Sequence, residues 1–78
     1  MNEEIGEIAE LLSDLLEDVP MKVRTEIEIA IGMLKGELDQ EGVIKVQDQL
    51  ELVSNMTNVD SYTRNEILNI ISDLENML

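Results

Sequence analysis

Apolar residues recur at intervals of three and four along most of this chain, and that spacing places them on one face of an α-helix. The first stripe extends from Ile5 to Val19, the second from Val23 to Leu34, and the third from Val43 to Met56. A fourth stripe with the same period lies between Ile67 and Leu78. The pattern predicts an all-α protein of four helices.

Pro20 marks the first break in this pattern. It lacks an amide hydrogen and pushes Val19 out of the helical region, so the first helix should end near Asp18 and the second should begin immediately afterwards. Two helices joined so tightly must fold back on each other. We therefore expect residues 3–37 to form an antiparallel helical hairpin.

Two later breaks divide the rest of the chain. Gly36 is typical of a helix end, and the polar stretch from Glu37 to Gly42 is predicted to be the longest connection. A second turn is expected at residues 57–60, after which the last helix should run to the end of the chain. Residues 43–78 are thus predicted to form a second hairpin.

The two predicted hairpins resemble each other at an offset of forty residues. The strongest correspondences pair Val19, Arg24, Glu26, Ile27, Ile31 and Leu34 with Val59, Arg64, Glu66, Ile67, Ile71 and Leu74. Upstream the similarity is weaker, and the same offset pairs Leu12 with Leu52 and Leu16 with Met56. Two units are too few for an open α-solenoid, so the repeat favours a four-helix bundle of two tandem antiparallel helical hairpins.

The length of 78 residues indicates one domain, residues 1–78, with a single core. The core should be aliphatic, because aromatic residues make up 1% of the chain, and its stability should be only a few kcal/mol. There is no cysteine to support a secreted, disulfide-linked fold, and we identify neither a signal peptide nor an apolar run long enough to span a membrane. We expect a soluble, cytoplasmic protein.

The chain is strongly acidic, with 18 Asp and Glu residues against 5 Lys and Arg and a formal net charge of −13. Such a charge repels nucleic acids and anionic membranes, so neither is expected as a partner. A basic protein partner is better matched to this surface. Solubility alone, or adaptation to a saline cytosol, is the alternative explanation.

The chain contains no histidine and no cysteine, which excludes the common nucleophilic triads and zinc sites. A lone tyrosine, Tyr62, is interpreted as a packing residue. The residue types therefore favour a protein that is not an enzyme and has no cofactor. An enzyme that uses paired carboxylates, with or without a metal, is the disfavoured alternative.

Acidic residues form a stripe along one side of the first predicted helix, at Glu3, Glu7, Glu10, Asp14 and Glu17. Hard cations such as Mg²⁺ or Ca²⁺ take carboxylate ligands, but carboxylates on a single helix do not enclose an ion. No calcium-binding loop pattern is present. We interpret the stripe as a solvated face and predict no metal site.

Arg24 and Arg64 occupy matching positions in the first turns of the second and fourth helices, where a cation opposes the helix dipole. Both are candidates for bracing a hairpin. Arg24 is expected to reach back to Asp14 or Glu17. For Arg64 the preceding helix offers only the side chains of Glu51 and Asn55.

The second helix has a second apolar side. Ile29 and Met33 lie one turn apart, away from the main stripe, and Gly32 and Gly36 border them. Small residues four positions apart allow close approach of another helix. These four residues form a candidate interface, covered either by a helix of the same bundle or by a second copy in a homodimer.

A resemblance to a known family rests on residues 11–24, Leu-Leu-Ser-Asp-Leu-Leu-Glu-Asp-Val-Pro-Met-Lys-Val-Arg, and on their echo from Val59 to Arg64. With its Val/Ile-Pro-x-x-x-Arg turn, nearly the whole chain resembles an archaeal family, uncharacterised protein family number 0147. The family usually repeats the proline where this chain has Asp60. The resemblance implies a helical bundle from an archaeal cytoplasm, without an assigned activity, and it transfers no functional residues.

Taken together, these features predict a small acidic helical module for protein–protein interaction. Its partner is expected to be a basic protein, and a homodimer is a further expectation from the second helix. The alternatives are the carboxylate enzyme and the acidic bystander adapted to salt.

Overall fold

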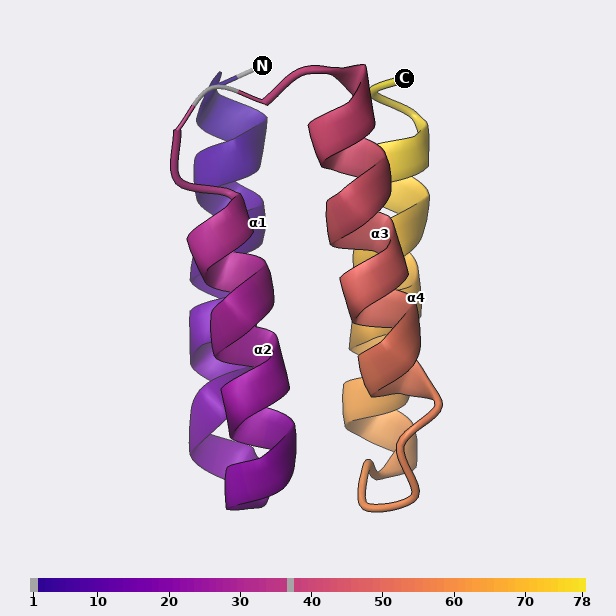
Figure 1. Cartoon of the computed structure of the whole chain (residues 1–78). Helices are drawn as coiled ribbons and strands as arrows, with labels where there is room; N and C mark the ends of the chain where they lie inside the picture. Colours follow the sequence, from indigo (N-terminus) through magenta and orange to yellow (C-terminus); the bar gives the residue numbers. More distant parts are fainter. Residues whose placement is uncertain (1, 37) are drawn as a thin grey trace.

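The computed structural model describes residues 2–36 and 38–78, and every regular element within them is helical. Figure 1 shows that the chain runs down one helix and up the next, so that both ends of the described chain lie at the same end of the bundle. The bundle has extents of 30 × 17 × 16 Å. The predicted all-α class and the four-helix bundle are confirmed. The elements are α1 (Asn2–Leu15), a short 3₁₀ turn η1 (Leu16–Asp18), α2 (Met21–Met33), α3 (Gln40–Ser54) and α4 (Ser61–Glu75).

The four helices share one aliphatic core. Each helix contributes a buried row at intervals of three and four, as the periodicity predicts. The buried apolar residues are Ile8, Leu12 and Leu15 of α1; Val23, Ile27 and Ala30 of α2; Leu34; Val43, Val46, Leu50 and Val53 of α3; Val59; and Ile67, Ile70 and Leu74 of α4.

Packing around the core is uneven. In Figure 1, α2 and α3 lie side by side in front, with α1 behind α2 and α4 behind α3. The α2–α3 and α3–α4 pairs are in close contact, whereas α1 contacts α2 and α4 more sparsely. α1 is therefore the most loosely packed of the four helices.

The start of α3 differs from the prediction. Residues up to Gly42 were expected to be a connection, but α3 begins at Gln40, and Gly42 lies in its first turn. Asp39 is the reason, since its Oδ1 accepts a hydrogen bond from the Gly42 amide at 2.7 Å and caps the helix. A Cβ at Gly42 would lie 3.0 Å from Leu38 Cδ2, so the glycine serves this tight cap rather than the end of a loop. Glu37, the first residue of the expected connection, lies outside the described residues.

Two other helix ends also differ from expectation. The last regular residue of α2 is Met33, and Gly36 follows in the turn with a φ of 115°, a left-handed conformation that glycine adopts without strain. α4 ends at Glu75 rather than at the end of the chain. The final residues form a turn in which the Met77 amide donates to Leu74 O at 3.0 Å.

The internal repeat has two registers rather than one. The N-caps of α2 and α4, Pro20 and Asp60, are forty residues apart, as predicted. The buried rows of α1 and α3 instead match at an offset of 38, which pairs Leu12 with Leu50, both fully buried. The predicted partner Leu52 is 49% exposed. The second turn is therefore two residues longer than the first, and this insertion explains the weak upstream similarity.

Candidate functional site

An open groove runs between α1 and α4, where packing is sparse. It has a volume of roughly 360 Å³ and is lined by Glu4, Glu7, Ile8, Leu11, Asp73, Asn76 and Met77. A second hollow continues it along α1, past Glu10 and Asp14. Carboxylates thus border the groove on both helices, and none of the residues that line these two hollows is basic. We call this surface the α1–α4 groove.

Leu11 is the exposed apolar residue in the α1–α4 groove. Its position in the first apolar stripe predicts burial, but the core takes Leu12 and Ile8 instead, and Leu11 remains 45% exposed beside α4. Met77, across the groove, is partly buried. The groove therefore combines apolar side chains with an acidic rim.

The acidic stripe of α1 does not form a preformed metal cage. The stripe continues into η1, and its five carboxylate residues, Glu3, Glu7, Glu10, Asp14 and Glu17, are exposed. Within residues 2–36 and 38–78, no three His, Cys, Asp or Glu side chains are grouped so that they could hold a metal ion.

Arg64 braces the second hairpin through backbone carbonyl groups. Its Nε donates to Ser54 O at 2.8 Å, and its Nη2 donates to Val59 O at 3.0 Å and Met56 O at 3.3 Å. These carbonyls belong to the end of α3 and the following turn, which lack helical partners of their own. The partners thus differ from the Glu51 and Asn55 side chains suggested by the sequence.

Arg24 has a different setting. Its side chain is exposed, and its backbone amide donates to Pro20 O at 2.9 Å. The shorter first turn is occupied by η1, Leu16–Asp18. The two arginines match in sequence, but the guanidinium of Arg64 is bonded to carbonyl groups at the end of α3 and in the longer second turn.

Two glutamines of α3 that the sequence did not single out join neighbouring helices. Gln49 Nε2 donates to both the carbonyl oxygen and Oε1 of Glu26 on α2, each at 2.9 Å. Gln47 Nε2 donates to Ile71 O at 3.2 Å and to Glu75 Oε2 at 2.9 Å on α4. Their partners lie more than twenty positions away, so local spacing gave no signal for either glutamine.

The candidate interface on α2 is exposed but does not act as one small-residue surface. Ile29 and Met33 are 45% and 37% exposed. Gly36 is explained by its turn conformation, and a Cβ at Gly32 would meet nothing within 4 Å. No helix of the described residues packs closely against either glycine, and Ile29 and Met33 remain as the apolar part of the candidate interface.

Asp60 caps α4 and carries a lowered pKa. Its Oδ1 accepts from the Thr63 amide at 2.8 Å. This hydrogen bond is the main cause that lowers the pKa of Asp60, and the Thr63 hydroxyl and the charge of Arg64 act in the same direction. Ionised Asp60 therefore stabilises the fold above about pH 3.9, the pKa of an unfolded aspartate, and this contribution is lost as the pH falls through the lowered pKa.

We expect Asp60→Asn to reduce the loss of stability on acidification. Urea unfolding at pH 5 and at pH 2.5 should show a smaller fall in midpoint for this variant than for the wild type, because asparagine still caps but does not titrate. Asp48→Asn, which removes one exposed carboxylate from the middle of α3, should retain the wild-type fall. An equal fall of the urea midpoint in the two variants would contradict a stabilising role for ionised Asp60.

Fold and groove together define a class: a small acidic four-helix bundle with a charged groove at its loosest helix pair. The family model of the uncharacterised protein family UPF0147 matches residues 1–77, and the chain belongs to that family. No curated protein and no solved structure matches the chain significantly. In the described residues, no helix is both long and apolar enough to cross a membrane.

Proposed function

We propose that this protein is a protein–protein interaction module that binds a basic amphipathic helix of a partner in the α1–α4 groove. The strongest support is that the half-exposed Leu11 lines the same groove as the carboxylates of Glu4, Glu7 and Asp73. The groove follows α1, whose 14 residues span about 21 Å, the length of a partner helix of similar size. The proposal assigns no catalytic role and no cofactor to the chain.

Charge and apolar contact have separate roles in this proposal. The net charge of −13 draws a basic partner to the protein and raises the association rate, an effect that salt screens. Contact with Leu11 and Met77 provides the part of the affinity that salt does not remove. A cytoplasmic setting and an archaeal origin, as implied by the family resemblance, belong to the same proposal.

The test is a titration with a defined probe, a fluorescein-labelled peptide of about 16 residues made of Leu and Lys in an amphipathic pattern. At 0.15 M salt, Glu7→Gln/Asp73→Asn should weaken peptide binding at least about fivefold, since two carboxylates at the rim are lost. Fluorescence anisotropy gives the dissociation constants. As a separate variant, Leu11→Gln should also weaken peptide binding, but the dependence of the affinity on salt should stay as in the wild type.

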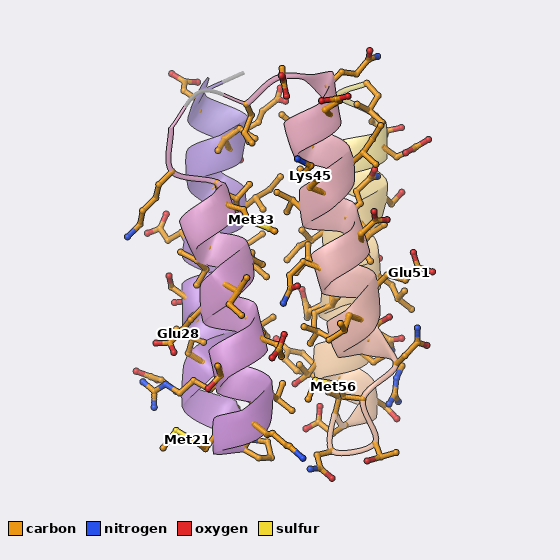
Figure 2. The ribbon with its side chains drawn as sticks, viewed as in Figure 1. Met21, Glu28, Met33, Lys45, Glu51 and Met56 are labelled. Atoms are coloured by element: carbon orange, nitrogen blue, oxygen red, sulfur yellow. The ribbon has the colours of Figure 1, made fainter. Side chains whose placement is uncertain are left out.

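The matched control is Glu28→Gln/Glu51→Gln, which also removes two negative charges but takes them from the outer sides of α2 and α3 (Figure 2). It should change the affinity by less than about twofold, because the local rim stays intact. Equal losses in the two double variants would mean that the peptide senses net charge alone. The acidic bystander would then be the better description.

A further inference from the structure

A second surface lies on the opposite side of the bundle, along the line where α2 meets α3. Gln49 of α3 bonds to Glu26 of α2, so these two positions mark the facing sides of the pair. The positions 22, 26, 29 and 33 form one row on α2, and 45, 49 and 52 form one row on α3, because residues three and four apart are neighbours on a helix. Figure 2 shows Met33 and Lys45 toward the line between α2 and α3, with Glu28 and Glu51 on the outer flanks.

Three large apolar side chains are half exposed on this surface. Ile29 and Met33 come from the row on α2, and Leu52 comes from the row on α3. Nothing else in the described chain covers them. These side chains come from two adjacent helices and lie on the same face of the bundle. Isolated exposed apolar residues, in contrast, are common on any protein surface.

The charge of this surface differs from that of the rest of the molecule. Lys22 and Lys45, two of the five basic residues, belong to the rows that flank it. The acidic residue within these rows is Glu26, which accepts a hydrogen bond from Gln49, and Asp48 lies beside the row on α3, one turn from both Lys45 and Leu52. These two lysines and two carboxylates balance, although the chain as a whole carries −13. We call this surface the α2–α3 face.

We propose that the α2–α3 face binds a second copy of this chain. A basic partner gains little from a surface whose carboxylates are balanced by lysines, and an acidic partner is repelled by the whole molecule. A second copy brings the same apolar side chains, together with carboxylates that can meet the lysines of the first. Such a self-complementary pair is the symmetric contact expected of a homodimer.

The size of the face sets the strength of the pairing. A side of the bundle 30 Å long and 17 Å wide offers roughly 500 Å², below the about 800 Å² per partner of a standard stable interface. Two copies that each carry −13 also repel each other. The dimer is therefore weak and concentration-dependent, and salt strengthens it by screening the repulsion. The α1–α4 grooves of both copies stay exposed on the outside, so a dimer binds two basic helices at once.

Sedimentation equilibrium of the full chain between about 20 μM and 1 mM tests this inference. The weight-average mass should rise from 8.8 kDa toward twice that value, and more steeply at 0.5 M than at 0.05 M NaCl. Ile29→Gln/Leu52→Gln should stay at the monomer mass while circular dichroism shows it folded. Lys45→Glu, a single exposed change, should weaken association at least about fivefold, and it decides the matter if the double variant does not fold.

Leu11→Gln is the control, because it removes an equally exposed apolar residue from the opposite side of the bundle. It should associate as the wild type does. A wild-type protein that remains a monomer at 1 mM in 0.5 M NaCl would overturn the inference. Loss of association in the control, with retention in the double variant, would overturn it as well. Neither result affects peptide binding in the α1–α4 groove, so the two proposals can fail separately.

Discussion

Leu12→Ala should destabilise the protein by about 2–5 kcal/mol, the cost of a cavity at a fully buried leucine. A domain of this size has only about 3–5 kcal/mol of stability from its core, so the variant should be largely unfolded near room temperature. Leu50→Ala should have an effect of the same size, since Leu50 is also fully buried. Urea unfolding followed by circular dichroism measures both.

Leu52→Ala is the matched comparison. The forty-residue offset makes Leu52 the counterpart of Leu12, whereas the structure leaves Leu52 half exposed. We expect it to cost less than about 1 kcal/mol, because little apolar surface is removed from the core. A Leu52→Ala variant as unstable as Leu12→Ala would contradict the 38-residue offset between the buried rows of α1 and α3.

Arg64→Ala should have the second-largest effect, a loss of about 2–3 kcal/mol. The substitution removes three hydrogen bonds from a charged donor and leaves the carbonyls of Ser54, Met56 and Val59 without that donor in a partly buried turn. Thermal and urea unfolding would show the loss. Arg64→Lys should recover only part of it, because an ammonium group cannot match the guanidinium fork.

Arg24→Ala provides the control at the repeated position. It removes an exposed guanidinium and should cost less than about 1 kcal/mol. Equal losses at Arg24 and Arg64 would contradict the view that only the second turn depends on its arginine. A small loss at both positions would remove the bracing role altogether.

The helices could be predicted because their signal is local. Each buried row repeats at three and four residues, and Pro20 separates the first two helices as its missing amide hydrogen requires. The start of α3 differs from the prediction because Asp39 caps a helix that begins at Gln40, whereas the glycine at position 42 indicated a connection. The register of α3 was missed because the similarity of α2 and α4 was extended upstream through a turn that is two residues longer.

The surfaces could be predicted only in part, because they depend on how helices distant in sequence pack. The acidic character of α1 is visible in its residue types, but its union with Asp73 and Met77 depends on the packing of α1 beside α4. The partners of Arg64 are backbone carbonyls, which no residue type reveals. The sequence singled out Ile29 and Met33 as a second apolar side of α2 and left open what covers them; the structure leaves both exposed and adds Leu52, which the sequence did not single out.

The most direct test of the proposed function is to map the Leu-Lys peptide on the protein by NMR. In a titration of isotope-labelled protein, we predict saturable shifts that concentrate on the groove residues Glu7, Leu11, Asp73 and Met77. Shifts that do not saturate, or that spread equally to Glu28 and Glu51 on the other helices, would contradict a dedicated groove.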